Sequence, residues 1–469
     1  MSNTWASGFQ TQREELTDVE LAVEGSFPEW LTGTFISNGP GQFEVGDTQL
    51  EHWFDALAML KRVRIGEGTV RYTNRFVRSD DFRVARDERR VRRALPGTPA
   101  DGSGLRRLYQ SLTGEFQDNP SIGVLKLDGD AYAVTESRCG IEIDPETLQT
   151  TGRRDLTAGL EADITLGHTH ADGGTQWGLA ADFGRTCAYT VFRRAPGEPP
   201  TELTRLAFDH RPPYVHAFAL TEHYVVVPES SFGVDFRALL ARTPLGGTFL
   251  DAFGPRGDSG AFHVLDRSTG ERVAEIEAEP FLVYHFANAY ERDAETIVVD
   301  CVKFTDEAAM TGLTVSNLRS DDPTLPRGDL VRFRLPLQGG RAREEQLVEG
   351  PCEFPTINYG YNGRRYEYAY LAVTDRGSLP TGIAKVAVDE PTVREWSEPG
   401  LHPGEAIFVS APSASAEDEG VLLSLALDGA NDRSVVLCLD ATTLEERGRA
   451  ARPHRDEPRI DRVSRTITV

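Results

Sequence analysis

The chain has 469 residues, and its 73 acidic residues outnumber its 50 lysines and arginines, which gives a formal charge of −23 at pH 7. Such a surface repels nucleic acid phosphates, so we expect no nucleic acid partner, and its acidic, arginine-rich composition favours a halophilic source. No apolar run reaches the roughly 18 residues that a membrane span needs. The N-terminus also lacks the basic and apolar regions of a secretory signal, so we expect a cytoplasmic protein.

Short β-rich runs bounded by glycine, aspartate, asparagine and proline recur along the chain, which predicts antiparallel strands joined by tight turns. They begin with GTFISNGP and continue as AYAVTES, HYVVVPES, ETIVVDCVKF, YEYAYLAVT, GIAKVAVD, VLLSLALD and SVVLCLDA. So many short strands fit a propeller better than a sandwich of about 100 residues. We therefore predict an all-β fold, a seven-bladed β-propeller with about 60 residues a blade, as one domain over residues 1–469.

Two segments depart from the strand pattern. Residues 81–95, DFRVARDERRVRRAL, have the period of an amphipathic helix, and their charges place it on the surface. The arginine-, glycine- and proline-rich segment 83–107 predicts a long loop over one face, where loops and short helices commonly cover a functional site. The five cysteines form no CxxC pair, so we expect them to be reduced, buried and structural: Cys139, Cys187, Cys301, Cys352 and Cys438.

Three of the ten histidines share apolar surroundings, namely His168 in TLGHTHAD, His216 in YVHAFAL and His285 in FLVYHFAN. Their separations are too wide for one helix or hairpin, so a shared site has to be assembled from different blades around the propeller axis. Neutral imidazole suits first-row metals such as iron or zinc. For each histidine alone, a hydrogen-bonded core position is the competing interpretation. Four of the remaining histidines are predicted to be structural or exposed, namely His52, His210, His223 and His263. His170 is predicted to lie beside the ligands or in a turn.

Three glutamates stand beside apolar strands, where a lone carboxylate is expensive to bury: Glu136 in YAVTES, Glu353 in GPCEFPTINY and Glu405 in HPGEAIFVSAP. A metal-bound histidine usually donates its free N–H to a carboxylate or carbonyl, which fixes the orientation of the ring. We therefore predict one carboxylate for each of the three histidines. Exposed positions at strand ends are the alternative for these glutamates.

The segments FISNGPGQFEVGD and EHWFDALAMLKRVRI, within residues 35–65, look like the N-terminal signature of the carotenoid cleavage oxygenases, an RNGPG-like turn followed by HWFDG. The resemblance extends over nearly the whole chain, in order, through NRFVRS, DNPSIGVLKLDGDAYAVTES, EIDPETLQTTG, the three histidine segments, EFPTIN, EAIFVSAP, EDEGVLLSLALD and LCLDATTLEE.

The resemblance implies a seven-bladed propeller that holds one Fe(II) on its axis through four histidines, three of them fixed by glutamates. The three histidines above match the first three ligands, the three glutamates match the carboxylates, and no catalytic residue is implied beyond the metal site. The implied reaction is cleavage of a conjugated double bond of a carotenoid or apocarotenoid by O2, giving aldehyde or ketone products such as retinal. The polyene substrate would enter an apolar tunnel, with peripheral contact to a membrane.

The C-terminus departs from the family. Its fourth ligand lies in a motif similar to PHxxPFGFHG, whereas residues 455–469 are atypical, and His454 matches the earlier histidine of that motif, which is not the ligand. Residues 462–466 can be encoded as CGG GTT TCA CGG ACG, and dropping the first base gives codons for Gly-Phe-His-Gly. We hypothesise that a frameshift hides the fourth histidine. If the sequence is correct as written, the site keeps three histidines and binds metal more weakly. Alternatively, His402 or His454 takes the place of the fourth ligand.

Other functions stay open beside the iron oxygenase. A stilbene-type cleavage oxygenase or an isomerase would use the same fold with a different pocket. A catalytically impaired propeller that binds a polyene or a protein partner would follow from the missing fourth ligand. A zinc hydrolase with three histidines and an activated water fits the literal ligand count but not the rest of the resemblance.

Overall fold

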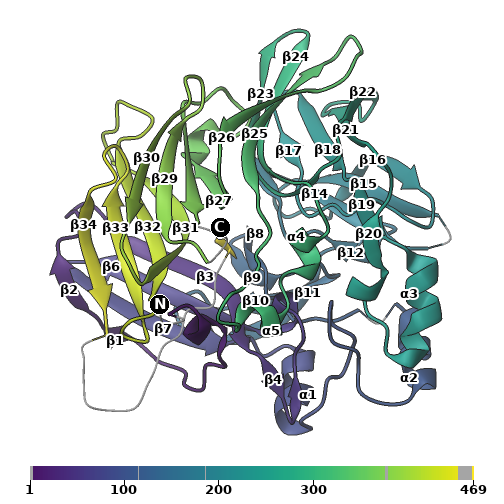
Figure 1. The fold of residues 1–469 in the computed structure, drawn as a ribbon, viewed down its shortest axis with the longest axis horizontal. Helices are drawn as coiled ribbons and strands as arrows, with labels where there is room; N and C mark the ends of the chain where they lie inside the picture. Colours follow the sequence, from purple (N-terminus) through teal and green to yellow (C-terminus); the bar gives the residue numbers. More distant parts are fainter. Residues whose placement is uncertain (1–3, 115, 185, 375–378, 453–466, 469) are drawn as a thin grey trace.

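The computed structural model describes residues 4–114, 116–184, 186–374, 379–452 and 467–468. Within these ranges, seven sheets of four or five antiparallel strands follow one another around a central axis (Figure 1). The predicted seven-bladed propeller is therefore confirmed. Blade 1 holds β3 (Gly33–Gln42), β6 (Leu57–Gly66), β7 (Thr69–Phe76) and β1 (Val19–Glu20). Blade 2 holds β8 (Gly123–Leu127), β9 (Asp130–Val134), β10 (Cys139–Ile143) and β11 (Thr150–Asp155). Blade 3 holds β12 (Ile164–Thr165), β13 (His170–Asp172), β14 (Thr175–Asp182), β15 (Cys187–Arg194) and β16 (Thr201–Phe208).

The remaining blades repeat this arrangement. Blade 4 holds β17 (Ala219–Leu220), β18 (Tyr224–Glu229), β21 (Gly260–Asp266) and β22 (Arg272–Ala278), and blade 5 holds β23 (Leu282–Asp293), β24 (Thr296–Phe304), β25 (Asp329–Pro336) and β26 (Arg343–Val348). Blade 6 holds β27 (Cys352–Ile357), β28 (Tyr368–Val373), β29 (Gly382–Ala387) and β30 (Thr392–Ser397). Blade 7 holds β31 (Leu401–Ser410), β32 (Gly420–Asp428), β33 (Arg433–Asp440), β34 (Glu446–Ala451) and β2 (Ala22–Gly25).

The N-terminal segment closes the ring of blades. Strand β1 pairs with β7 on the outer edge of blade 1, and the next strand, β2, pairs with β34 on the outer edge of blade 7. An apolar cluster between these two blades joins Val63 and Tyr72 to Val421 and Leu423. The segment therefore bridges the outer edges of blades 1 and 7 and closes the ring.

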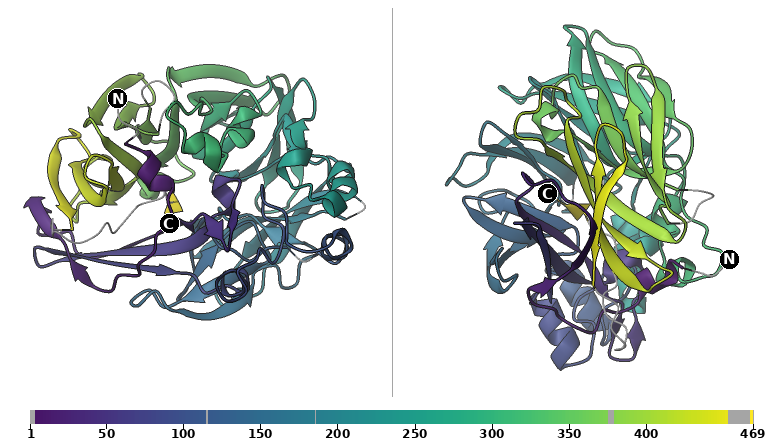
Figure 2. Two further views of the ribbon diagram at one scale, coloured as in Figure 1. Left: turned by 60° about the horizontal axis from the view of Figure 1, so that its bottom comes forward. Right: turned by 90° about the vertical axis from the view of Figure 1, so that its left-hand side faces the viewer.

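The C-terminal strand lies at the axis. Strand β35 (Ile467–Thr468) pairs with β3 at Asn38 and Ser37 and also contacts β8 and β31. These partners are the first strands of blades 1, 2 and 7, and the end of the chain stands near the centre of the ring in Figures 1 and 2. The backbone of residues 467–468 is therefore close to the axis on which the family resemblance places the fourth ligand.

Short helices and two small hairpins cover one face of the ring. The helices are α1 (Asp80–Asp87), α2 (Gly104–Leu112), α3 (Phe236–Arg242), α4 (Ala308–Thr311) and α5 (Val315–Leu318), and the 3-10 turns of this face are η1 (Ala6–Phe9), η2 (Trp53–Asp55), η3 (Thr243–Leu245) and η4 (Leu250–Ala252). A further 3-10 turn, η5 (Tyr359–Tyr361), connects β27 to β28. The hairpins are β4 (Glu44–Val45) with β5 (Thr48–Gln49) and β19 (Phe232–Val234) with β20 (Phe253–Pro255). No helix within the described ranges has the length and apolar character to cross a membrane.

Two predictions for this face need correction. The helix expected over 81–95 ends at Asp87, because Arg89 adopts a positive φ of 54° that a right-handed helix cannot contain. The loop expected over 83–107 is accordingly shorter, since α1 occupies its start and α2 its end. All five cysteines are free as expected, but Cys139 is half-buried.

Candidate metal centre

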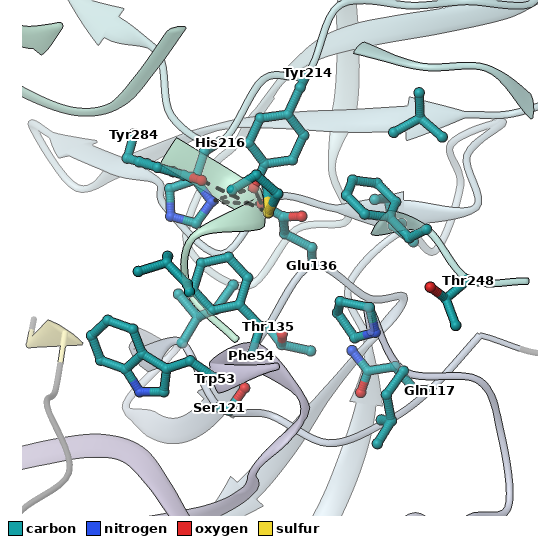
Figure 3. Close-up of a pocket in the computed structure, with 18 of the residues that line it drawn as sticks. Trp53, Phe54, Gln117, Ser121, Thr135, Glu136, Tyr214, His216, Thr248 and Tyr284 are labelled. Atoms are coloured by element: carbon teal, nitrogen blue, oxygen red, sulfur yellow. Dashed lines mark hydrogen bonds and ion pairs between the residues drawn. The ribbon is translucent and has the colours of Figure 1, made fainter. Parts of the chain in front are cut away.

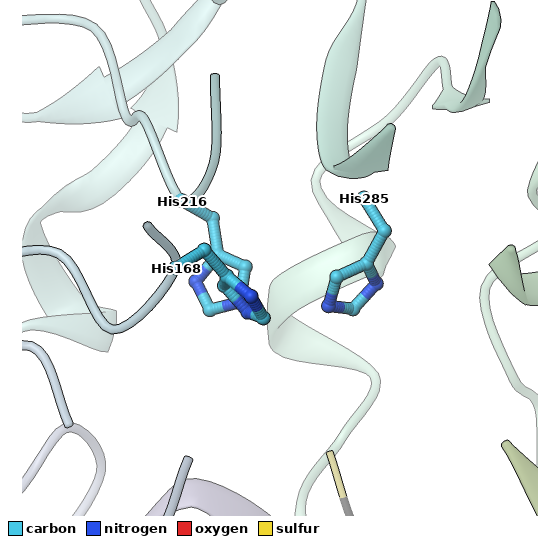
Figure 4. Close-up of side chains that lie close together, drawn as sticks. All are labelled: His168, His216 and His285. Atoms are coloured by element: carbon cyan, nitrogen blue, oxygen red, sulfur yellow. The ribbon is translucent and has the colours of Figure 1, made fainter. Parts of the chain in front are cut away.

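The three predicted histidines meet at the axis although they come from three different blades. His168 follows β12, His216 precedes β17, and His285 lies on β23. Their ligand atoms all lie within 4.8 Å of one another, and the Nε2 atoms of His168 and His216 are 3.1 Å apart (Figure 4). The strand β23 shifts register against β24 on both sides of Phe286, and such bulges turn a neighbouring side chain out of the regular pleat.

Two of the predicted carboxylates hold histidines of this cluster. Oε1 of Glu136 accepts a hydrogen bond from Nδ1 of His216 at 2.6 Å, and Oε2 of Glu353 accepts one from Nδ1 of His285 at 2.7 Å. An ionised carboxylate can only accept, so the proton of each ring is on Nδ1. The lone pair of Nε2 in each ring therefore remains available to a metal.

The backbone around Glu353 is strained in a way that fits this role. The next residue, Phe354, has a left-handed φ of 54°, which is rare for a bulky side chain, and the β27–β28 register shifts between Glu353 and Thr356. The N–H of Phe354 donates to the Glu353 carboxylate, and the Phe354 ring lies 5.5 Å from the ring of His285. The bulge thus places both the carboxylate and an aromatic wall against one ligand.

The electrostatics of the cluster fit a bound cation. Burial, and then the neighbouring His216 and His285, hold the pKa of His168 well below its usual value, so this imidazole is neutral. Burial also lowers the pKa of His285, but Glu353 and the charge of Glu405 outweigh that effect and raise it overall. Nε2 of His285 is buried and makes no hydrogen bond among the described residues. Converging imidazole nitrogens, one of them without a partner, suit a first-row metal ion.

Two buried tyrosines complete the surroundings of the histidines. The Tyr214 hydroxyl lies 3.4 Å from Oε1 of Glu136 and 3.4 Å from Nδ1 of His216, and the Tyr284 hydroxyl donates to the carbonyl of Ala309 at 3.0 Å. Burial, followed by nearby negative charge, raises the pKa of both phenols well above its usual value. Sequence reasoning missed these tyrosines, although one precedes a histidine ligand in YVH and the other in VYH.

The remaining sequence candidates lie elsewhere or act indirectly. Hydrogen bonds join only two of the expected histidine–carboxylate pairs in the part of the chain that is described, and Glu405, on β31, acts on His285 through its charge. His402 does not join the histidine cluster: its Nε2 is 2.9 Å from the Thr4 hydroxyl and its Nδ1 is 3.1 Å from the Pro380 carbonyl. His454 and the proposed frameshift lie outside the described residues.

The other histidines have local partners. His170 stands beside the cluster as expected, with its Nε2 2.9 Å from the Phe218 carbonyl oxygen. His263 is buried against Glu229 at 2.8 Å, and His223 is exposed and pairs with Glu291 at 2.7 Å. These contacts agree with the structural and exposed positions predicted for them.

A cavity of about 600 Å³ opens beside the histidines and is lined by His216, His285, Glu136 and Glu353. Most of its remaining wall is apolar or aromatic, as Figure 3 shows for Trp53, Phe54, Tyr214 and Tyr284. Polar side chains interrupt this wall, among them Gln117, Ser121, Thr135 and Thr248, and so do the charged residues Arg107, Asp163 and Asp182. A largely apolar molecule with a few polar groups is the ligand that such a cavity suits.

The HWFD segment builds one wall of this cavity. The Asp55 carboxylate accepts hydrogen bonds from the His52 N–H at 3.0 Å, the Gly97 N–H at 2.8 Å and the Thr98 hydroxyl at 2.6 Å. Burial raises the pKa of Asp55 to about 6 and lowers that of His52 to about 4, and Nε2 of His52 lies 2.9 Å from the Met310 carbonyl oxygen. The segment therefore fixes the loop 94–100, which lines the cavity in part, against the turn η2.

Comparison with known proteins places the chain in a family. The model of the retinal pigment epithelial membrane protein family matches residues 9–458. Carotenoid cleavage dioxygenase 8 of Arabidopsis thaliana chloroplasts is 32% identical, with 94% of this chain and 82% of that protein covered. The β,β-carotene 15,15'-dioxygenase of Gallus gallus is 30% identical, with 94% of each chain covered.

Solved structures share the fold. A variant of the Synechocystis apocarotenoid oxygenase has a TM-score of 0.84 at 24% identity, with 96% of both chains covered. The cobalt-substituted form of that enzyme has a TM-score of 0.84 at 23% identity, with 98% of this chain and 97% of the other covered. The match over residues 9–458, together with the two relatives at 32% and 30% identity, shows that the chain belongs to the retinal pigment epithelial membrane protein family.

Proposed function

We propose that this chain is an Fe(II)-dependent dioxygenase that cleaves a conjugated double bond of a carotenoid or apocarotenoid. The observation behind the proposal is the convergence of three imidazole ligand atoms within 4.8 Å, beside an apolar cavity of about 600 Å³. The names of the Arabidopsis and Gallus relatives support the substrate class. One alkene and one O2 give two carbonyl products, so the reaction balances without another reductant.

The residues of the centre have separable tasks. His168, His216 and His285 would hold iron(II), which supplies the activation of O2 when bound. Glu136 and Glu353 accept the Nδ1–H of their histidines, so the ring nitrogens that face the axis keep their lone pairs. Because the imidazole ligands are neutral, the carboxylates hydrogen-bonded to them also offset part of the charge of a divalent ion. Tyr214 restrains Glu136 through its hydroxyl.

The cavity wall positions the substrate and limits water. Phe54, Tyr214 and Tyr284 present aromatic surface close to the histidines, which favours a flat polyene over a hydrated substrate (Figure 3). Gln117 and Thr248 offer hydrogen bonds inside this apolar space, and they suit the oxygen atom at the end of an apocarotenoid.

A product analysis tests the proposed reaction. The iron-loaded protein is incubated with an apocarotenoid aldehyde in air and under argon, and the products are separated by chromatography with mass detection. We expect two carbonyl products in air, none under argon, and loss of turnover in His216→Ala. Products under argon, or a geometric isomer as the main product, would reject oxidative cleavage in favour of isomerisation.

An exposed apolar patch at the cavity mouth is the contact that we assign to a lipid bilayer. Leu105 and Leu245 are 81% and 89% exposed, on α2 and η3, which contact each other. Leu112 and Phe116 join this patch and also line the cavity. An exposed apolar surface at a helix whose polar side holds Arg106 and Arg107 suits insertion into a bilayer interface, from which a polyene could enter directly.

Vesicle flotation tests this assignment. The double variant Leu105→Glu/Leu245→Glu should lose binding to phospholipid vesicles and keep turnover of detergent-dispersed substrate. Val393→Glu is the matched control, because Val393 is 51% exposed on β30 of blade 6, away from the cavity lining. Equal flotation of the double variant and the wild type would show that this patch is not the membrane contact.

A further inference from the structure

A second cavity, of about 310 Å³, lies between blades 1 and 2 and shares no lining residue with the first. Strands β6 and β7 of blade 1 form one side, and the β10–β11 turn of blade 2 forms the other. Its lining is polar and rich in arginine, in a chain whose net charge is −23: Thr17, Asp18, Arg62, Arg64, Thr73, Arg75, Glu146, Thr147 and Gln149.

One arginine of this cavity is buried without an adequate partner. Arg62 is 5% exposed, and its Nε makes no hydrogen bond to any residue that the structure describes. Its other contacts are long: Thr73 Oγ1 at 3.4 Å, Glu146 at 3.5 Å and Asp18 at 3.7 Å. Hydrogen bonds from a guanidinium to an oxygen are normally about 2.7–3.2 Å long, so the N–H groups of Arg62 make only weak hydrogen bonds here. A buried charge in this condition needs an acceptor.

The neighbouring charges do not supply that acceptor. Oδ1 of Asp18 makes no hydrogen bond among the described residues, but its nearer ion-pair partner is Arg71, whose Nε lies 3.0 Å away against 3.7 Å for Nη2 of Arg62. The pairing with Arg71 lowers the pKa of Asp18. The side chain of Glu146 is 71% exposed, so water weakens its attraction to Arg62.

Two further arginines face the same space. Arg64 follows Arg62 by two residues on β6, so the two side chains lie on the same face of the strand. On β7, Thr73 is opposite Arg62 in the register, and Arg75 lies two residues beyond it. Nε of Arg75 is buried and has no hydrogen-bond partner within the described ranges, and its Nη2 is 3.4 Å from the Thr17 hydroxyl. Three forked, planar donor groups around one cavity match the geometry of a tetrahedral oxyanion.

We propose that this cavity binds a small oxyanion of the phosphate class, and that the bound anion fastens the N-terminal segment that closes the propeller. Thr17 and Asp18 line the cavity and immediately precede β1, which is followed by β2 on blade 7. An anion between Arg62, Arg64 and Arg75 would therefore join blade 1 to the start of the closing segment. The site is independent of the metal centre and of the proposed reaction.

Inorganic phosphate is the ligand to test first, by calorimetry and thermal unfolding of the full chain at constant ionic strength set with NaCl. We expect a saturable rise in Tm at millimolar phosphate and slower hydrogen exchange in residues 17–25. Arg64→Gln should weaken phosphate binding roughly tenfold, because it removes one charge-assisted hydrogen bond. The Arg64 side chain is exposed, so this substitution should leave folding intact. Arg62→Gln should abolish the saturable rise in Tm with phosphate.

The control variant is Arg341→Gln, which removes an exposed arginine that pairs with Glu277 and Glu279 on another part of the ring. It should bind phosphate like the wild type. Phosphate also stabilises proteins by exclusion from their surface, but that effect does not saturate and is the same in every variant. A rise in Tm that does not saturate with phosphate, and that is equal in Arg64→Gln and the wild type, would overturn the proposal.

A second titration identifies the source of the phosphate group. Binding of glycerol phosphate as tight as that of inorganic phosphate assigns the site to phosphate esters as well as the free ion. Exclusion of glycerol phosphate assigns it to the free ion alone. Both results support the site, whereas no heat and no saturable change in Tm with either compound would contradict it.

Discussion

Replacing Glu353 with glutamine removes the negative charge behind one ligand and preserves the size of the side chain. Oε2 of Glu353 accepts the Nδ1–H of His285 at 2.7 Å, and Oε1 is buried without a hydrogen-bond partner in the part of the chain that is described. A glutamine can offer His285 only a neutral carbonyl, and its amino group would then be buried where Oε1 is now. Loss of a carboxylate that holds a metal ligand typically lowers metal affinity about 10–100-fold, or about 1.4–2.7 kcal/mol.

Titration with Co(II) under nitrogen, followed by visible absorption, measures this affinity without oxidation of the metal. Glu136→Gln should show a loss of similar size, because Glu136 holds His216 in the same way. The matched control is Glu229→Gln, since Glu229 pairs with the buried His263 at 2.8 Å outside the histidine cluster. Unchanged Co(II) affinity in Glu353→Gln, or an equal loss in Glu229→Gln, would refute the role assigned to these carboxylates.

Two further predictions concern single residues, and a third concerns the codons at the 3′ end of the gene. Burial raises the pKa of Asp55 to about 6, so Asp55 adds stability as the pH falls through that value. The stability of Asp55→Asn should therefore fall behind that of the wild type by about 2 kcal/mol more near pH 4 than near pH 7, measured by urea unfolding. A constant difference would contradict this. His402→Ala should leave the metal content unchanged, because both ring nitrogens of His402 have other partners, and a loss of metal would reinstate it as a ligand. Sequencing the 3′ end of the gene should find codons at residues 462–466 that encode Gly-Phe-His-Gly after loss of one base, and other codons would refute the frameshift.

Sequence alone predicted the parts of the site that depend on residue type and order. His168, His216 and His285 were recognisable because each interrupts an apolar run, and the strand pattern supplied a propeller axis where they could meet. Glu136 and Glu353 followed from the cost of burying an unpaired carboxylate. Which glutamate holds which histidine depends on distances between blades, and no spacing along the chain contains that information.

The covering face was harder to predict for a physical reason. The helix expected over 81–95 ends early, and beyond it Arg93 lies 3.4 Å from Asp81 and 3.6 Å from Asp118, contacts that join distant segments. In α2, Leu105, Tyr109 and Leu112 have the period of a buried helical face, yet all three are exposed. Periodicity identifies an apolar face but not whether protein or lipid covers it.

Anomalous diffraction at the iron edge, from crystals of the iron-loaded protein, locates the metal directly. We expect one strong peak per chain, at the axis, within bonding distance of His168, His216 and His285. A protein that takes up no iron, or a peak away from these three rings, would contradict the assignment of this cluster as the catalytic metal centre.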